Sequence, residues 1–379
     1  MLVEFKKSVY KRCKNFTKVK KYYIIAWRIN NGIVSYERNE KILNKKKILK
    51  GIGITLLVIL ILCITSIVTM GIMVYSKFSK INTIQLENIE INEGVEEALE
   101  GYRNVAILGI DARADVYSGS RSDCIIIASI NEKNKEVKLT SVYRDTYVYI
   151  DGHGYDKITH AYAYGGPELA INTINKNFDL DIKEFVAVNF DAVVEIIDAI
   201  KGVEIDIQED ELKYINSYIK GVNKQMGRND ANITHAGKQN LSGVQALAYS
   251  RIRYTEGGDY KRTERMRDVL SLVFEKAKKK NAFELSDLAD MLFPRVYTNV
   301  DKTEILKAIP EASKYNITTS QGWPYEVRGY TGRAWYGVPV TLESNVKKLH
   351  EVLFGDDGYE VSSKVKEYSE GICKETGYR

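Results

Sequence analysis

Aspartate and arginine residues form four short clusters in this 379-residue chain, and they are the side chains best suited to chemistry. The clusters are G-I-D-A-R (109–113), S-R-S-D (120–123), R-D (144–145) and the arginine-rich run 251–267. Guanidinium groups bind phosphate oxygens through paired N–H donors. Carboxylates bind Mg²⁺, whose other ligands are usually water and phosphate. The residue types therefore favour a site for a phosphorylated ligand and a divalent metal.

Apolar runs predict the strands that must position the first three clusters. These runs are 104–110, 124–130 and 136–143, and their continuity is typical of buried strands. If the last two pair around a turn at 131–135, Asp123 lies opposite Tyr143 or Arg144. Asp111 follows the carboxyl end of the first strand, a usual ligand position in α/β sheets. The carboxylates and Arg144 are therefore expected at one edge of the sheet.

Spacing within the fourth cluster also predicts shared faces. Arg251 and Arg253 are two residues apart and point the same way on an extended segment. Arg262 and Arg265 are three apart and share a face on a helix, with Asp259 at the N-terminal cap. Each feature alone is typical of a cap, a turn or solvated surface charge. Their convergence from separate elements favours an anionic phosphate site.

The remaining pattern predicts an α/β domain. Helices are expected at 167–178, 191–200, 242–249 and 262–279, strands at 184–190 and 203–207, and a late helix ending at 350–354. Alternating elements without a linker indicate one mixed central sheet with helices on both faces, an α-β-α sandwich. Hydrophobic residues at 44% exclude a mainly disordered chain, and four cysteines and four histidines argue against a disulfide framework or a zinc enzyme.

One uncharged segment, 51–76, predicts a transmembrane helix before this domain. As a helix it spans about 39 Å, more than the roughly 30 Å hydrocarbon core. A buried core helix or a cleaved signal peptide fits its length and flanks less well. Residues 1–50 contain 15 basic and 3 acidic side chains, so the positive-inside rule predicts a cytoplasmic N-terminus and an extracellular domain. No helix-turn-helix pattern accompanies this basic tail, and no nucleic-acid partner is expected.

The expected organisation has five parts. They are a basic cytoplasmic tail (1–50), a transmembrane helix (51–76), an extracellular spacer (77–100), a catalytic domain (101–355) and a polar C-terminal tail (356–379).

Several motifs, in order, resemble those of the LytR-CpsA-Psr family of Gram-positive cell-wall assembly proteins. The motifs are N-V-A-I-L-G-I-D-A-R (104–113), R-S-D-C-I-I-I-A-S-I (121–130), S-V-Y-R-D-T-Y-V-Y-I (141–150), K-I-T-H-A-Y-A-Y-G-G (157–166) and L-S-G-V-Q-A-L-A-Y-S-R-I-R-Y…G-D-Y-K-R-T-E-R (241–265). The resemblance implies a single-pass cell-membrane phosphotransferase. Such an enzyme moves a teichoic acid, capsular or similar polymer from an undecaprenyl-pyrophosphate carrier to a muramic-acid hydroxyl of peptidoglycan through a phosphodiester.

The resemblance also implies residue roles. Asp111 and Asp123 would bind Mg²⁺, with Mn²⁺ as an alternative. A base is needed only if the bound metal does not activate the acceptor hydroxyl, and Asp123 and Asp145 are then the candidates. The catalytic set is Asp111, Asp123, Arg144 and Asp145, and the pyrophosphate set is Arg113, Arg121, Arg144, Arg251, Arg253, Arg262 and Arg265. The residues expected to line a cavity for the prenyl tail are Val193, Ile196, Ile197, Val269, Leu270 and Val273.

The chain departs from the family pattern at four positions. Cys124 replaces the usual Thr, Met266 a frequent Gln, Tyr143 a frequent Pro and Lys261 a small residue. None of these changes removes a metal carboxylate or a central arginine. Two alternatives remain open: a non-catalytic regulator that binds polyprenyl pyrophosphate, and a hydrolase that releases free polymer.

Overall fold

The folded part of the chain is a mixed α/β domain. A computed structural model describes residues 82–110, 119–281, 293–301 and 311–379, with Lys21, Arg28, Glu284, Leu285, Leu288, Met291, Glu304 and Ile305. Asp111, Arg113, the segment 51–76 and all of the tail 1–50 except Lys21 and Arg28 lie outside the described residues. Among the described helices, none combines the length and apolar character needed to cross a membrane.

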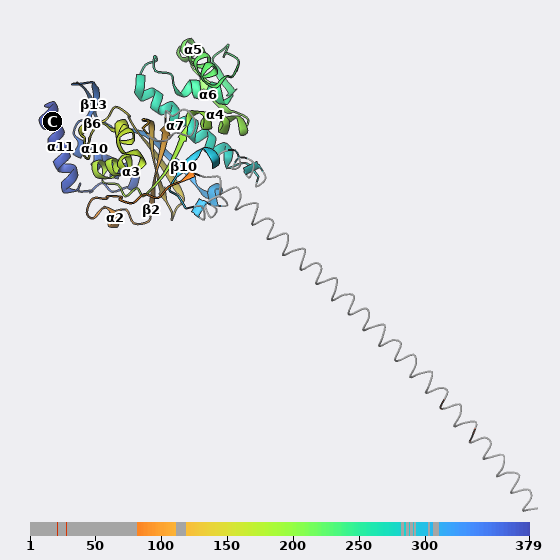
Figure 1. Cartoon of the computed structure of the whole chain (residues 1–379), viewed down its shortest axis with the longest axis horizontal. Coiled ribbons are helices and arrows are strands. Elements are labelled where there is room, and N and C mark those ends of the chain that lie inside the picture. The colour runs from red at the N-terminus through yellow and green to blue at the C-terminus, as the bar shows by residue number, and fades with distance from the viewer. Residues whose placement is uncertain are drawn as a thin grey trace, which may run out of the picture. The chain divides into compact units, whose positions relative to one another are not determined.

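A seven-stranded sheet forms the centre of the domain (Figure 1). In spatial order its strands are β1 (Asn82–Thr83), β10 (Val296–Thr298), β7 (Glu184–Asn189), β2 (Tyr102–Ile110), β3 (Ser122–Asn131), β4 (Glu136–Val142) and β11 (Asn316–Trp323). Strands β2, β3 and β4 are antiparallel, while β7 runs parallel to β2 and β11 parallel to β4. Three hairpins complete the strands: β5 (Tyr147–Ile150) with β6 (Gly154–Lys157), β8 (Val203–Ile207) with β9 (Gly237–Leu241), and β12 (Val327–Thr331) with β13 (Trp335–Pro339). The mixed sheet confirms the predicted fold class.

The β3–β4 hairpin confirms the predicted register. Ile125 pairs with Val142 across the two strands, and continuing that register sets Asp123 opposite Arg144. Successive side chains of a strand alternate between the two faces. Leu108 of β2 therefore joins the core on one face, while the neighbouring Ile107 faces the other side.

Helices on the first face seal the main hydrophobic core. They are α3 (Ile158–Phe178), α10 (Leu342–Phe354) and α11 (Ser363–Thr376), with the short α2 (Val95–Ala98) beside them. Within α3, Gly165 and Gly166 have non-helical dihedral angles, and Gly166 has φ of 66°. Only glycine adopts this angle readily, so the chain kinks there before Pro167.

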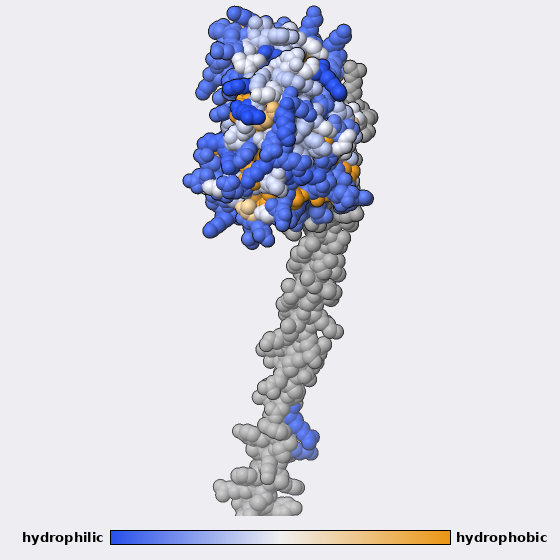
Figure 2. Space-filling view, turned by 90° about the vertical axis from the view of Figure 1, so that its left-hand side faces the viewer, coloured by the Kyte–Doolittle hydropathy of each residue, from blue (hydrophilic) through white to orange (hydrophobic). Residues whose placement is uncertain are grey.

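The opposite face carries a second group of helices (Figure 1). They are α4 (Phe190–Ala199), α5 (Glu209–Met226), α6 (Gly243–Ser250) and α7 (Gly258–Ala277), followed by two short 3₁₀ turns, η1 (Phe293–Arg295) and η2 (Ala312–Lys314). Helices α4, α5 and α6 form their own core with β8 and β9, while α7 lies over the central sheet. Figure 2 shows a mostly hydrophilic surface with hydrophobic residues in narrow patches.

Both segments that flank the expected catalytic domain contain secondary structure. Residues 356–379 are not a loose polar tail, because α11 buries Val365, Tyr368 and Ile372 in the main core. The expected spacer 77–100 contains β1 and α2, and Val95 is buried. Both segments are rich in charged residues, which obscured the few apolar positions that bring them into the fold.

Candidate functional site

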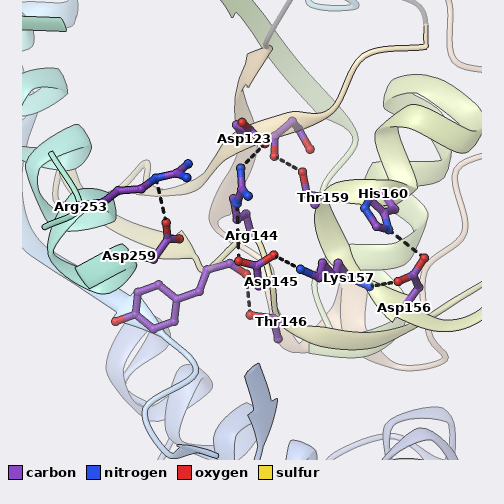
Figure 3. A network of polar contacts seen from close by, with 12 residues as sticks. Asp123, Arg144, Asp145, Thr146, Asp156, Lys157, Thr159, His160, Arg253 and Asp259 are labelled. Atoms are coloured by element: carbon purple, nitrogen blue, oxygen red, sulfur yellow. Dashed lines mark hydrogen bonds and ion pairs between the residues drawn. The ribbon is translucent and has the colours of Figure 1, made fainter. Parts of the chain in front are cut away.

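Arg144 occupies the centre of a charged cluster at the start of β3 and the end of β4. Its Nη1 lies 2.9 Å from Asp123 Oδ1, and its Nε lies 3.6 Å from Asp145 Oδ2. Lys157 Nζ donates to Asp145 Oδ1 at 2.7 Å. Figure 3 shows Arg144 between the two aspartates, with Lys157 on one side and Asp259 on the other. Residues from β3, β4 and the start of α3 therefore meet at one point.

The first turn of α7 adds a second ion-paired group to this cluster. Arg262 Nη2 donates to Asp259 Oδ2 at 3.0 Å, and Arg253 Nε lies 3.4 Å from Asp259 Oδ1. Arg262 is only 3% exposed. Burial lowers its pKa; Asp259 opposes this effect, while the positive charges of Arg253 and Arg144 add to it. Asp259 lies inside the first turn of α7 rather than at its cap, which is Gly257.

Several polar atoms in and beside the cluster lack hydrogen-bond partners. They are Arg144 Nε, Arg262 Nε, Arg267 Nη1 and Asp123 Oδ1, so the Asp123–Arg144 ion pair lacks hydrogen-bond geometry. A buried polar group without a partner costs about 1–3 kcal/mol. Arg144 and Arg262 therefore each keep a donor without a protein partner in the cluster.

Asp123 Oδ1, which is ion-paired with Arg144 but accepts no hydrogen bond, also fits a magnesium ligand set. Mg²⁺ is usually bound by one or two carboxylates and completed by water and phosphate. The described residues contain no group of three or more Asp, Glu, His or Cys side chains that could hold a metal. Asp123 beside Arg144 is compatible with such a small number of protein ligands. Its predicted partner, Asp111, lies outside the described residues.

Two of the other predicted arginines, Arg251 and Arg121, have different surroundings. Arg251 ends α6 with helical dihedral angles, and its guanidinium lies over the Phe190 ring at 5.2 Å. Arg251 and Arg253 are thus not on an extended segment, and they contact different partners on either side of the buried Ile252. Arg121 is exposed beside β3.

Arg265 differs from the other arginines because its guanidinium is hydrogen-bonded on every nitrogen. Nε donates to Glu211 Oε1 at 2.8 Å, Nη1 to the Ile252 carbonyl at 3.1 Å, and Nη2 to Thr255 Oγ1 at 2.7 Å. Arg265 and Glu211 are 1% and 2% exposed. The pair joins α7 to α5, a helix that sequence patterns did not predict. A pyrophosphate contact for Arg265 stays a prediction.

An apolar cavity of about 380 Å³ opens next to the charged cluster. Its walls come from β2, β3, β7, α4, α6 and α7, and they include Gly109, Cys124 and Met266. Five predicted tail-binding residues line it: Val193, Ile196, Val269, Leu270 and Val273. Ile197, the sixth, is fully buried in the core around α4.

A second apolar cavity of about 260 Å³ continues the first along the sheet. The two share the lining residues Ile107, Ala128, Ile130 and Leu270. Along strand β2, the first cavity reaches Gly109 and the second reaches Arg103. The six residue steps between these positions span roughly 20 Å. The two cavities together therefore extend along most of strand β2.

Sequence reasoning assigned no role to two residues beside the cluster. Lys157 contacts Asp145, and His160 Nδ1 lies 2.8 Å from Asp156 Oδ2. Both belong to the motif at 157–166, which was the available signal. Cys124 separates Asp123 from the cavity, and burial raises the pKa of its thiol to about 11, so it is a neutral wall of the site.

A charged cluster beside an apolar cavity is the arrangement expected of a protein that binds a phosphorylated amphiphile. Comparison with known proteins agrees with this class. The LytR_cpsA_psr family profile matches residues 68–349. The chain belongs to the LytR-CpsA-Psr family.

Relatives of known name are transferases. The chain is 30% identical over 256 residues to the polyisoprenyl-teichoic acid–peptidoglycan teichoic acid transferase TagT of Bacillus subtilis, covering 66% of this chain and 74% of TagT. It is 34% identical over 224 residues to a TagU transferase of Enterococcus faecalis, covering 58% of this chain and 68% of the relative.

Solved structures share the fold. A structure of TagT bound to LIIa-WTA matches with a TM-score of 0.56 and 25% identity, covering 73% of this chain and all of that chain. TagT with bound octaprenyl pyrophosphate lipid matches with a TM-score of 0.52 and 24% identity, covering 73% of this chain and all of that chain. The second likeness concerns the fold alone.

Proposed function

We propose that the protein is a membrane-anchored phosphotransferase of the cell surface. It transfers a glycopolymer, a teichoic acid or a capsular or secondary wall polysaccharide, from undecaprenyl pyrophosphate to a muramic-acid hydroxyl of peptidoglycan. The junction of the charged cluster with the apolar cavity carries this proposal. A diphosphate with a prenyl tail needs both environments side by side, and Cys124 borders both.

In the proposed reaction, the acceptor hydroxyl oxygen attacks the sugar-proximal phosphorus. The bond from that phosphorus to the bridging oxygen breaks, polyprenyl phosphate leaves, and a phosphodiester forms. Arg144 and Arg262 bind the diphosphate and stabilise the charge on the leaving phosphate, the main requirement in phosphoryl transfer. The hydroxyl proton passes to a carboxylate, for which Asp123 and Asp145 are the candidates.

Magnesium is the proposed cofactor. Asp123, with Asp111, would hold it, and the bound ion would neutralise negative charge on the phosphates. Anchoring is proposed through 51–76, with the tail 1–50 in the cytoplasm and the folded domain outside. This arrangement brings the domain to the membrane surface that presents a lipid-linked donor.

The decisive experiment uses the full-length chain in detergent with Mg²⁺, a lipid-linked polymer donor and peptidoglycan. We expect a covalent polymer–peptidoglycan conjugate that disappears when Mg²⁺ is chelated. Asp123→Asn should reduce conjugate formation at least 100-fold, whereas Asp357→Asn, at an exposed position outside the cluster, should not. Binding without product would indicate a regulator, and free polymer would indicate a hydrolase.

A further inference from the structure

A smaller pocket lies on the side of the charged cluster formed by Asp145 and Asp259. Its volume is about 250 Å³. The lining residues are Tyr143, Asp145, Thr146, Gly257, Gly258, Asp259, Tyr260, Val327, Trp335 and Gly337. The pocket thus joins β4, the start of α7 and the β12–β13 hairpin, and neither apolar cavity shares a residue with it.

Aromatic rings exposed to solvent characterise this pocket. Trp335 is 46% exposed and Tyr260 36% exposed, and both are among the few large apolar side chains this accessible in the described chain. Tyr143 packs edge-on against Tyr260, with ring centroids 4.4 Å apart. Grouped, exposed aromatic surface marks a place where a ligand docks.

The β12–β13 hairpin holds the indole of Trp335 in place. Gly329 lies opposite Gly337 in the hairpin, and a Cβ on Gly329 would come within 2.9 Å of Trp335 Nε1. Glycine is therefore needed there for the close approach of the indole. The Gly337 amide donates to the Asp145 carbonyl at 2.9 Å, which joins the hairpin to the charged cluster.

Two carboxylates give the pocket its polar character. Asp145 and Asp259 line it and are also ion-paired in the charged cluster. A hydrocarbon would offer no polar contact to these carboxylates and would remove water from them, which disfavours the prenyl tail as the occupant. A pyranose ring fits both features, because its C–H face packs on an aromatic ring and its hydroxyls donate to carboxylates.

We propose that this pocket is a pyranose-binding subsite, with Trp335 and Tyr260 as its stacking surfaces and Asp145 and Asp259 as hydroxyl acceptors. The assignment rests on the proposed function, which brings sugars to this cluster from two sources. One is the first sugar of the polymer donor, and the other is a sugar of the peptidoglycan acceptor.

The test measures binding by the full-length chain in detergent. Three ligands are compared: a prenyl pyrophosphate without sugar, the same lipid carrying one N-acetylhexosamine, and a soluble peptidoglycan glycan fragment. Trp335→Ala should weaken binding of a sugar-bearing ligand about tenfold, a loss typical of one aromatic contact. Trp335→Phe should keep most of the affinity, and Tyr254→Ala, at a 72% exposed tyrosine outside the pocket, should keep all of it.

The pattern across ligands identifies the source of the sugar. A loss confined to the lipid-linked sugar assigns the pocket to the donor, and a loss confined to the glycan fragment assigns it to the acceptor. The inference is overturned if Trp335→Ala binds both as wild type does, or if the wild-type chain binds neither. Failure of the proposed function has a different signature, since the sugar-free prenyl pyrophosphate would then not bind.

Discussion

Arg262 and Arg265 lie three residues apart on α7, yet their surroundings differ. Arg262 contacts Asp259 and keeps a buried Nε without a partner. Arg265 is enclosed by protein acceptors, Glu211 among them. Arg262 thus has a donor that no protein group uses, as the proposed pyrophosphate role requires, whereas Arg265 joins α5 to α7.

Arg265→Met should destabilise the folded domain by about 3 kcal/mol or more, because it leaves the Glu211 carboxylate buried and unpaired. The double variant Arg265→Met/Glu211→Leu should recover most of this loss, since no charge is then stranded. Chemical denaturation of both variants measures the difference. If the stable double variant also transfers polymer at the wild-type rate, the pyrophosphate role of Arg265 is excluded.

His350 provides a pH-dependent contribution to stability. It is 1% exposed, and its Nε2 lies 3.1 Å from the Phe178 carbonyl. Burial lowers the pKa of its imidazole below the usual 6.5. Because the unfolded chain takes up the proton more readily, this contribution is complete above pH 6.5 and is lost as the pH falls below it.

Denaturation midpoints should therefore fall more steeply in the wild type than in His350→Gln between pH 7 and pH 5. The difference between the two curves isolates His350 from the carboxylates that titrate in the same range. Parallel curves would show that His350 has the same affinity for protons in both states.

At the scale of elements, α7 connects the two halves of the site. Arg262, Met266, Val269 and Val273 recur at helical spacing and lie along one face. The N-terminal end of that face meets the charged cluster, and the remainder lines the apolar cavity. A single helix thereby contributes to both the charged cluster and the wall of the apolar cavity, and it fixes the spacing between them.

Ala128 lines both apolar cavities, so enlarging it tests their joint use. Ala128→Phe should block passage from one cavity to the other and weaken binding of a long prenyl pyrophosphate about tenfold. A ten-carbon prenyl pyrophosphate, which needs only the space near the cluster, serves as the internal control. Titration of both ligands gives the ratio, and equal effects on the two would contradict a continuous tail site.

At the scale of the whole molecule, the chain divides into residues 1–75 and a folded unit, 76–379. The proposed topology places the tail 1–50 and the α/β domain on opposite sides of a membrane. In a variant whose native cysteines are replaced by serine, Lys364→Cys should react with a membrane-impermeant maleimide in intact protoplasts. Lys21→Cys should react only after lysis, and equal labelling of both before lysis would refute the topology.

The sequence alone determined those features that depend on local patterns. Apolar runs predicted β2, β3 and β4, and the β3–β4 register placed Asp123 opposite Arg144, as the ion pair confirms. Helical periodicity placed α4 and α7, and the resemblance to the family named five of the residues that line the cavity. These inferences succeed because strand alternation and helical spacing are properties of the backbone itself.

Which polar side chains have hydrogen-bond partners, and which lack them, depends on the tertiary structure. Glu211 reaches Arg265 from a helix 54 residues earlier in the chain, and Trp335 approaches Asp145 through a hairpin that no local pattern predicted. The apolar residues of α11 are sparse among charges, so their burial also depended on the finished core. Partners distant in sequence meet through packing, and packing is set by the whole chain rather than by any one segment.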